Sequence, residues 1–424
     1  MLLGPETHLS QPLEAKMKDS PFKNTSGETG FTYAEEICPS CESKGLSLFY
    51  EVRNIPIHCT SIMLTREEAS KSPQGDIVLG FCEQCGFITN IAFDPAIQDN
   101  SPIYEEQQGF SPTFQAYADE LADHLINKYD LYDKNIVEIG CGKGDFLIHL
   151  CELGHNRGVG IDPISVNVRA ESEAANRLVF IQDYYSEQHG RYHSDLVVCR
   201  HTLEHIPFTA EFVRTLRRAI GDRIETTIFF EVPDVTRILS ELAFWDIYYE
   251  HCSYFSPGSL ARLFRHCGFE LTDFNRAYDD QYLLLEATPV RTPSRNLFEI
   301  EESPEYTAQN IKSFSTRLRD MLDRWAQRLR KVHNQGKRTV IWGSGSKCVG
   351  FMTSLTIKDE IEYVVDINPY RHGKFIPGVG KEIKPPKFLK QYKPDLVIVM
   401  NSIYLNEIKQ ALDNMDVPTE VISV

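Results

Sequence analysis

The stretch IVEIGCGKGD, residues 136–145, decides the fold of the central part of the chain. A short β-branched run ends in Gly140, Gly142 and Gly144, and glycines at this spacing let the backbone turn tightly and approach a ligand without a Cβ in the way. A helical pattern follows directly. The stretch therefore predicts a buried strand, a glycine-rich loop and a helix, which is the repeating unit of doubly wound α/β folds.

Four more apolar runs follow this one, each separated from the next by a helical stretch. They occupy residues 157–162, 178–183, 195–200 and 227–234. Their β-branched and mostly uninterrupted composition is typical of strands that are buried on both faces. We therefore predict an α/β domain with a doubly wound parallel sheet over residues 101–290.

The glycines alone do not identify a ligand, because such a loop also serves a dinucleotide, a phosphate or a plain turn. Asp162 ends the second run, about twenty residues after the loop, where an acid can accept hydrogen bonds from ribose hydroxyls. A dinucleotide and S-adenosylmethionine (SAM) both fit this pattern. Two details favour SAM: the loop reads E-x-G-x-G-x-G from Glu138, and the fourth run leads into RHTLEHIP, residues 200–207.

Together these motifs resemble those of class I SAM-dependent methyltransferases, over roughly residues 120 to 290. The resemblance implies that the methionine part of SAM lies over the glycine loop, the ribose on Asp162 and the adenine near Asp183. The expected cofactor site comprises Glu138, Gly140, Gly142, Gly144, Asp162, Asp183 and Arg200.

His201 and His205 follow the fourth run. We expect helix capping or packing for at least one of them, and we assign a catalytic role to neither.

Length and charge limit the classes of protein that fit. The chain has 424 residues, more than one hydrophobic core usually organises, so two or three domains are expected. Its 44 Lys and Arg against 60 Asp and Glu give a formal charge of −16, which repels nucleic acid and anionic membranes. No apolar run approaches the roughly 20 residues that span a bilayer. We predict a cytoplasmic protein without a nucleic-acid or membrane partner, with a disordered or extended tail over residues 1–34.

Four of the eleven cysteines form two C-x-x-C pairs, each followed closely by glycine. The pairs are Cys38 with Cys41 and Cys82 with Cys85, and each can direct two thiolates at one cation. Four sulfurs close a tetrahedral zinc site, so such a metal would be structural. Two unrelated pairs of reduced thiols are the alternative. The pattern predicts a small zinc-binding module over residues 35–100.

A second α/β pattern follows a polar linker near residue 290 and a long helix whose apolar residues recur at steps of three or four. Its strand-like runs cover residues 339–345, 361–368, 395–401 and 419–424. We interpret the helical stripe as packing and predict a C-terminal Rossmann-like α/β domain over residues 303–424.

This domain has its own glycine-rich loop, which contains Gly343 and Gly345 and is followed by Lys347. Asp366 ends the next run, and Arg371 lies in a nearby loop with His372 and Lys374. Backbone N–H groups at a helix N-terminus, together with these cations, suit a diphosphate. A nicotinamide dinucleotide and a fold without a ligand are the alternatives. The predicted substrate-binding residues are Gly343, Gly345, Lys347 and Arg371.

The segment IYYEHCSYFS, residues 247–256, places an acid and an imidazole among tyrosines. With the four cysteines before it and the second glycine loop after it, the order resembles the three-domain sugar C-methyltransferases, which methylate C3 of a nucleotide-linked 4-keto-deoxysugar. The resemblance implies that His251 is the general base and that Glu250 and Tyr248 help to form the sugar site. It also implies a tyrosine from the preceding segment, for which Tyr104 is the nearest candidate.

The chemistry of methyl transfer to carbon also requires a general base, and His251 suits this role. A C–H beside a ketone becomes nucleophilic only when a base removes its proton and the enolate oxygen is stabilised, whereas oxygen and nitrogen acceptors already carry a lone pair. Histidine, with an ordinary pKa of about 6.5, accepts such a proton near neutral pH. The nearby acid can orient the ring, and tyrosine hydroxyls can bind the sugar or its enolate.

Three features depart from the sugar enzymes. The loop reads E-I-G-C-G-K-G where many of them carry E-I-x-S-N-D-G, and their H-E-H is Y-E-H here, with Tyr249 in the first position. The tyrosine-rich segment reads PIYEEQQGFSPTF, residues 102–114. The particular nucleotide sugar, the carbon and its stereochemistry, and the oligomeric state stay open.

Three rival functions remain. The methyl acceptor could be an oxygen or a nitrogen of another small molecule. A nicotinamide-dependent oxidoreductase built on the C-terminal loop is disfavoured by the lack of an obvious Tyr-x-x-x-Lys pair after that sheet. A scaffold that binds SAM only as a sensor is disfavoured by the intact Y-E-H segment.

Overall fold

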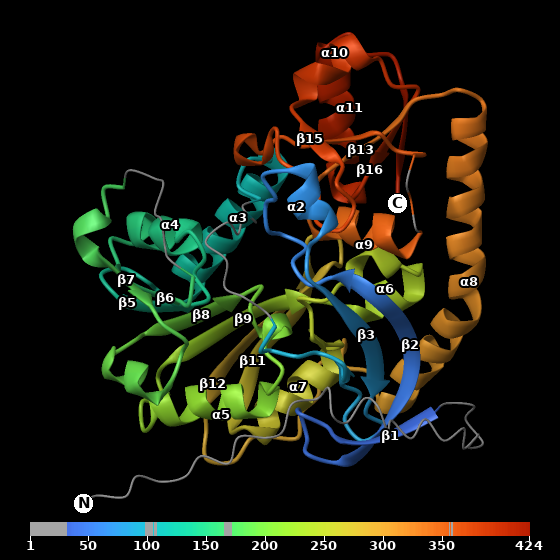
Figure 1. Cartoon of the computed structure of the whole chain (residues 1–424). Coiled ribbons are helices and arrows are strands. Elements are labelled where there is room, and N and C mark those ends of the chain that lie inside the picture. Colours follow the sequence, from blue (N-terminus) through green and yellow to red (C-terminus); the bar gives the residue numbers. More distant parts are fainter. Residues whose placement is uncertain (1–31, 98–104, 106–107, 165–171, 356, 358) are drawn as a thin grey trace, which may run out of the picture.

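The computed structural model of the chain describes residues 32–97, 105, 108–164, 172–355, 357 and 359–424. In this part of the chain the strands form three sheets, with five, seven and five strands in chain order (Figure 1). Short 3-10 helices connect some of the elements. They are η1 (Ala175–Arg177), η2 (Glu187–Arg191), η3 (Leu203–His205), η4 (Phe244–Asp246), η5 (Pro369–Arg371), η6 (Pro386–Phe388) and η7 (Ser402–Tyr404).

The seven-stranded sheet has the order β11-β12-β9-β8-β5-β6-β7. Five neighbouring strands run parallel, and the hairpin β11–β12 closes one edge antiparallel to β9. This is the doubly wound sheet that the sequence predicts, with an antiparallel hairpin that the strand runs did not include. The strands are β5 (Asn135–Ile139), β6 (Arg157–Asp162), β7 (Leu178–Gln182), β8 (Leu196–Arg200), β9 (Thr227–Pro233), β11 (Phe269–Ala277) and β12 (Tyr282–Pro289).

Helices cover both faces of this sheet because its strands are apolar on both sides (Figure 1). Along β5, Ile136 packs with the α3 and α4 side, whereas Val137 and Ile139 pack with the α5 and α7 side. The alternation follows from successive strand side chains pointing to opposite faces. The helices are α3 (Pro112–Lys128), α4 (Asp145–Leu153), α5 (Thr209–Ile220), α6 (Val235–Glu241) and α7 (Pro257–His266).

The N-terminal sheet is antiparallel, with the order β1-β2-β3-β4-β10. Its last strand comes from the central part of the chain, since Ser253 and Tyr254 pair with Thr89 and Ile88. The strands are β1 (Thr32–Ile37), β2 (Lys44–Pro56), β3 (Gln74–Phe81), β4 (Ile88–Asn90) and β10 (Ser253–Tyr254), and α2 (Arg66–Ser70) lies between β2 and β3.

The C-terminal sheet is parallel throughout, with the order β15-β14-β13-β16-β17. It forms the upper part of the molecule in Figure 1, above the central sheet. Its strands are β13 (Thr339–Trp342), β14 (Tyr363–Val365), β15 (Glu382–Lys384), β16 (Leu396–Val399) and β17 (Glu420–Ser423), and its helices are α9 (Ser346–Ser354), α10 (Leu389–Tyr392) and α11 (Leu405–Asn414).

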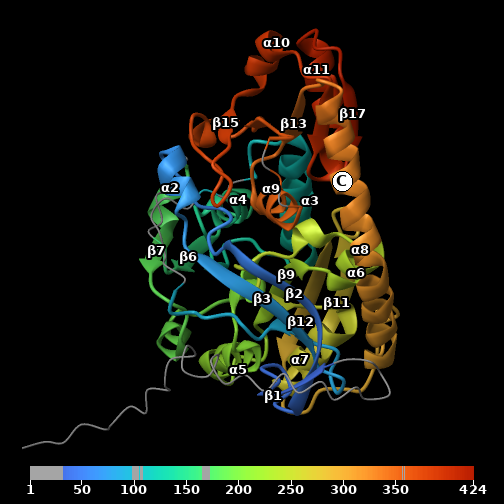
Figure 2. The same cartoon turned by 45° about the vertical axis from the view of Figure 1, so that its right-hand side comes forward.

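The long helix α8 (Pro304–Asn334) runs along one side of the molecule from the N-terminal sheet to the C-terminal one (Figure 2). Ser303 caps it by accepting the N–H of Tyr306, and Pro304 occupies the first turn. Its apolar stripe packs into a core that also contains Ile77 of β3 and Ile341 of β13. The stripe is therefore packing, as predicted.

The N-terminal and C-terminal sheets share that one core with α6, α8 and α9, and β10 belongs to the N-terminal sheet although it lies far along the chain. The domain boundaries drawn from the sequence therefore stay a prediction. Within the described residues, no helix is both long and apolar enough to cross a membrane.

Candidate functional site

A cleft of about 740 Å³ lies between the carboxyl edge of the central sheet and the C-terminal sheet. The central glycine loop, the segment after β8 and the Y-E-H segment line it together with the C-terminal glycine loop. The structure thus brings both predicted loops and the predicted base to one cavity. Tyr104 lies outside the described residues.

The central loop is built from left-handed glycines. The φ angles of Gly140, Gly142 and Gly144 are 70°, 53° and 84°. A Cβ on Gly140 would lie 2.0 Å from Oγ1 of Thr202 in the segment after β8. The N–H of Gly142 donates to Oδ2 of Asp162 at 2.9 Å, so the loop and the strand-end acid are held together as the sequence pattern implied.

The two predicted strand-end acids differ in their surroundings. Asp162 is buried and lines the cleft, and its burial raises its pKa, although the N–H groups of Gly142 and Ile164 oppose this. Asp183 follows β7 with its side chain 43% exposed, and it is absent from the described residues that line the cleft. Its carboxylate accepts a hydrogen bond from Gln188 at 2.8 Å.

Glu138 and Arg200 lie at the ends of adjacent strands and both line the cleft. Burial raises the pKa of Glu138 to about 8, although the charge of Arg200 opposes this. Arg200 forms an ion pair with Glu231 and lies 4.1 Å above the ring of Phe146. In the described part of the chain, Oε2 of Glu138 and Nη2 of Arg200 are buried without a hydrogen-bond partner, which suits a polar ligand such as the methionine group of SAM.

The Y-E-H segment sends its side chains in two directions. The hydroxyl of Tyr248 lies 2.6 Å from Nε2 of His251, and both residues line the cleft. The hydroxyl of Tyr249 instead accepts the N–H of Asp94 at 2.9 Å, and its ring packs so closely on Gly75 that a Cβ there would lie 2.4 Å away. Tyr249 is therefore an anchor to the N-terminal sheet.

Glu250 also faces the N-terminal segment. Its carboxylate accepts the N–H of Cys59 at 2.9 Å and the hydroxyl of Thr60 at 3.1 Å. The acid close to the His251 ring is Glu204, with Oε1 4.0 Å from Nε2 of His251. The sequence analysis did not single out Glu204, although the motif RHTLEHIP places it between two histidines at the end of β8.

His201 and His205 both line the cleft beside this acid. Nδ1 of His205 hydrogen-bonds the carbonyl oxygen of Glu250 at 3.0 Å, and Nδ1 of His201 lies 3.7 Å from Oε1 of Glu204. The side-chain donor atoms of Glu204, His205 and His251 lie within 4.8 Å of one another, which also suits a metal ion. Because the Tyr248 hydroxyl occupies Nε2 of His251, we interpret the cluster as an acid–base group.

Burial lowers the pKa of His251, and the nearby positive charges of His205, His201 and Lys347 lower it further. A buried, neutral imidazole with a lone pair is the form that accepts a proton from carbon. The arrangement can therefore perform general-base chemistry beside the glycine loop.

The C-terminal loop repeats the geometry of the central one. Gly343 has a φ of 106°, and Oδ2 of Asp366 accepts the N–H and the hydroxyl of Ser344 at 2.7 Å and 2.5 Å. Lys347, at the start of α9, forms an ion pair with Asp246. A Cβ on Gly345 would meet no atom within 4 Å, so the loop leaves room beside its backbone.

Arg371 connects three parts of the chain. Its guanidinium donates to the carbonyl oxygens of Ser344 at 3.0 Å and Thr60 at 3.1 Å, and also to that of Glu105. Both predicted cations of this loop therefore line the cleft while bound to other groups of the protein.

The four predicted zinc ligands lie together. Sγ of Cys38 is 3.7 Å from that of Cys85, and Sγ of Cys41 is 3.6 Å from that of Cys82. A tetrahedron with zinc–sulfur distances of about 2.3 Å has sulfur–sulfur distances of about 3.8 Å. The four side chains therefore fit a zinc ion.

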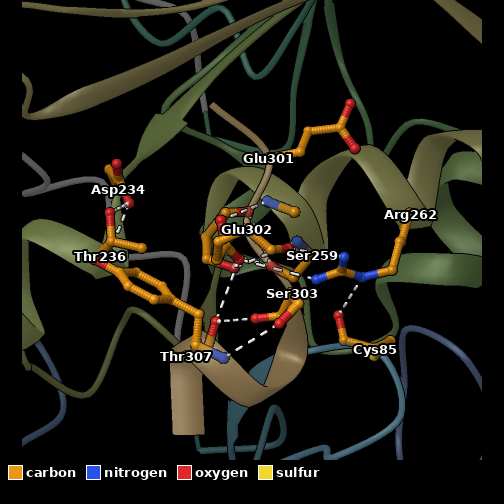
Figure 3. Close-up of polar contacts among 12 residues, drawn as sticks. Cys85, Asp234, Thr236, Ser259, Arg262, Glu301, Glu302, Ser303 and Thr307 are labelled. Carbon is orange, nitrogen blue, oxygen red and sulfur yellow. Dashed lines mark hydrogen bonds and ion pairs between the residues drawn. The ribbon is translucent and has the colours of Figure 1, made fainter. Parts of the chain in front are cut away.

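One residue of the cysteine cluster, Cys85, is hydrogen-bonded to the central part of the chain, as Figure 3 shows. Arg262 of α7 donates from Nε to the carbonyl oxygen of Cys85 at 2.9 Å and from Nη1 to that of Glu302 at 3.0 Å. The carboxylate of Glu302 in turn accepts the N–H of Gly258 at 2.9 Å. The strand β4 follows Cys85 and pairs with β10, which follows the Y-E-H segment, so the cluster and that segment adjoin strands of one sheet.

Comparison with known proteins gives two family matches. A family model described as a methyltransferase domain matches residues 114–273, and one described as a C-methyltransferase C-terminal domain matches residues 287–418. The C-methyltransferase NovU of Streptomyces niveus is 25% identical over 315 residues, which cover 70% of this chain and 74% of that protein.

Solved methyltransferase structures resemble parts of the chain. One is the 1,6-didemethyltoxoflavin-N1-methyltransferase of Burkholderia thailandensis with S-adenosylhomocysteine, at 15% identity and a TM-score of 0.32 over 41% of this chain and 78% of that one. Another is the magnesium protoporphyrin IX methyltransferase of Synechocystis PCC 6803 with bound SAH, at 14% identity and a TM-score of 0.32 over 42% and 84% of the two chains.

The two domain matches follow one another along the chain, and the relative, itself a C-methyltransferase, covers 70% of the chain. The chain therefore belongs to the multi-domain, SAM-dependent C-methyltransferases, in which a class I methyltransferase domain precedes a C-methyltransferase C-terminal domain.

Proposed function

We propose that the protein transfers a methyl group to the carbon beside the ketone of a nucleotide-linked 4-keto-deoxysugar, with His251 as the general base. One observation carries this proposal: the Tyr248 hydroxyl and the His251 ring are in contact in the cleft that both glycine loops line. A carbon acceptor becomes nucleophilic only when a base removes its proton, whereas oxygen and nitrogen acceptors already carry a lone pair.

In the proposed reaction, His251 takes the proton from the carbon beside the ketone, and the electron pair of that bond forms the enolate. Tyr248 donates its O–H toward the enolate oxygen. SAM supplies the methyl group from its sulfonium centre. The enolate pair would form the new bond between the substrate carbon and the methyl carbon, while the pair of the broken carbon–sulfur bond would leave with S-adenosylhomocysteine. His251 afterwards releases its proton to water.

The cofactor residues keep their proposed roles. Gly140, Gly142 and Gly144 would let SAM approach the backbone, and Asp162 would hold its ribose. Glu138 and Arg200 would meet its methionine group, because each has a buried polar atom without a partner among the described residues. Asp183, which is partly exposed, would meet the adenine from the rim.

The acceptor would be bound from the C-terminal side. Gly343 and Gly345 would offer backbone N–H groups to a diphosphate at the start of α9, and Lys347 and Arg371 would add positive charge. Arg371 now holds three carbonyl oxygens, so we propose that it supports the loop as much as it contacts the nucleotide. Glu250 would complete the sugar site through Thr60.

Zinc would be a structural ion at Cys38, Cys41, Cys82 and Cys85, where a closed tetrahedron leaves no position for water.

All eleven cysteines are free of disulfides in the structure, which suits the cytoplasmic location that we propose.

An acceptor panel tests the function. Purified protein, SAM and a set of nucleotide-linked 4-keto-deoxysugars should give S-adenosylhomocysteine and a product with a carbon-bound methyl group, detected by mass spectrometry and NMR. His251→Ala should still bind SAM but lose turnover and the exchange of the substrate C–H with solvent deuterium. His155→Ala, at a ring that is 71% exposed, is the matched control. A methyl group on oxygen or nitrogen, without deuterium exchange, would contradict the proposal.

A further inference from the structure

Two acidic side chains compete for the role of partner to His251. Glu250 is its neighbour in sequence, but the contacts of its carboxylate with Cys59 and Thr60 direct it toward the N-terminal segment. Glu204 lies 47 positions earlier in the chain, yet it lines the cleft and approaches Nε2 of His251 to 4.0 Å. Proximity in space therefore favours Glu204.

The carboxylate of Glu204 can interact with the imidazolium that forms when His251 takes a proton. The residue is only 2% exposed, and its Oε2 has no hydrogen-bond partner within the described part of the chain. Its Oε1 lies between two imidazoles, 3.7 Å from His201 and 4.0 Å from His251. A buried carboxylate is costly unless positive charge lies close to it, and His201 is the ring that supplies this charge before turnover.

The charges of this cluster balance before turnover. Arg200 pairs with Glu231, whose second oxygen lies 3.3 Å from His201 and accepts the hydroxyl of Tyr117 at 2.7 Å. Burial lowers the pKa of His201, but Glu231 and Glu204 outweigh this and raise it to about 9. His201 is therefore a cation at neutral pH and offsets the charge of Glu204.

Turnover upsets this balance because His251 gains a positive charge. The groups that face its ring are Glu204, His205 and His201 after β8, Lys347 of α9, and Tyr248 and Tyr254 of its own segment. The three basic groups among them all disfavour an imidazolium. A protonated Nε2 also can no longer accept the Tyr248 O–H, so it needs an acceptor of its own.

We propose that Glu204, and not Glu250, is the positioning carboxylate that stabilises the imidazolium of His251; this inference rests on the proposed function of His251 as base. The proton taken from the substrate carbon resides on His251, where its N–H is directed to Glu204. The proton stays on His251 and leaves from there to water after the product departs. The Tyr248 hydroxyl is released from Nε2 in the same step and can donate to the enolate oxygen.

Three variants test this assignment. Glu204→Gln keeps the shape of the side chain and removes its charge, and Glu204→Asp keeps the charge. Glu250→Gln, at an acid of the proposed sugar site, serves as the comparison for the pKa of His251 and not for kcat. We expect Glu204→Gln to lower kcat about 10- to 100-fold, the size expected for one hydrogen bond between charged groups. Glu204→Asp should recover part of this loss.

The pKa of His251 is the readout that a purely structural role would not move. Selective ¹⁵N labelling of histidine, with His251→Ala to assign the signal, gives this pKa by NMR without any acceptor. Removing the charge of Glu204 should lower the pKa of His251, because a nearby anion favours the imidazolium. The rising limb of the kcat/KM profile should then move to lower pH, while Glu250→Gln should leave both where they are.

An unchanged pKa of His251 in Glu204→Gln, or a lowered one in Glu250→Gln alone, would overturn the assignment. Because the NMR titration needs no acceptor, this result is independent of the acceptor panel. A heteroatom-methylated product would overturn the proposed reaction and leave the measured pairing of Glu204 with His251 in place.

Discussion

At Gly140 the central loop touches the segment that carries His201 and Glu204. The left-handed φ of 70° disfavours any residue with a Cβ by about 1–2 kcal/mol. The added Cβ would also lie 2.0 Å from Oγ1 of Thr202, 2.7 Å from its methyl group and 2.9 Å from its own Cβ, so rotation of one atom cannot relieve the overlap. We expect Gly140→Ala to weaken SAM binding about tenfold or more, measured by titration calorimetry.

Gly336 supplies the control for this variant. It has a similar φ of 69°, but a Cβ there would meet no atom within 4 Å. Gly336→Ala should therefore lower the unfolding temperature slightly through backbone strain alone and leave SAM affinity unchanged. Equal SAM affinities in the two variants would show that contact with Thr202 does not matter for the loop.

The roles of single residues were predictable where they follow from a short sequence pattern. The loop glycines follow from their spacing, and the four cysteines from the C-x-x-C pattern. The roles of Glu250, Tyr249 and Glu204 did not follow, because they depend on contacts across the fold. Glu250 meets Cys59 and Thr60, about 190 positions away in the chain, and no local pattern carries that information.

Among the elements, α8 holds the N-terminal and C-terminal sheets to one core. Phe314 is fully buried on this helix and packs against Phe49 and Tyr50 of β2, with ring centroids 6.4 Å and 6.1 Å away. Phe314→Ala removes these contacts and leaves a cavity, so we expect a loss of about 3–5 kcal/mol in stability. Differential scanning calorimetry should show a lower unfolding temperature.

The exposed face of the same helix gives the comparison. Tyr306 is 54% exposed, so Tyr306→Ala should shift the unfolding temperature far less. If both variants unfold together with the wild type, α8 does not contribute to the shared core.

Element types were predictable wherever a clear apolar pattern marks them. The parallel strands of the central sheet are short uninterrupted apolar runs, and the apolar residues of α8 recur at steps of three or four. The two-residue strand β10 has none, and it forms only because β4 offers it an edge to pair with. Short strands of this sort are determined by their partner rather than by their own sequence.

For the whole molecule, the cysteine cluster is expected to set the position of the base. Elemental analysis should find about one zinc per chain. Cys82→Ser should lose the metal and, because β4 follows the second cysteine pair and aligns β10, should lower kcat while SAM affinity persists. A metal-free protein that is fully folded and active would contradict the structural role of zinc.

Cys267→Ser is the control for this variant. Cys267 is also buried, but it lies in the core of the central sheet, where its thiol contacts the carbonyl oxygen of Ala210. It should retain zinc and turnover, with at most a modest loss of stability.

The order of the three units was predictable from the sequence, and their shared core was not. Hydrophobic periodicity reports which face of an element is buried, but it does not report which other element covers it. Ile77, Phe314 and Ile341 each fit an ordinary local core, and only the folded chain brings them together.

The guanidinium of Arg371 joins segments from three distant places, and among the described residues all but one of its hydrogen bonds go to main-chain oxygens, the exception being the hydroxyl of Ser344. At Thr60 and Glu105 this connection therefore does not depend on which side chains the two positions carry. If the C-terminal half is exchanged to alter the choice of acceptor, Arg371 and the backbone path of the two loops that carry Thr60 and Glu105 have to be preserved. A matched set of surface side chains is not required.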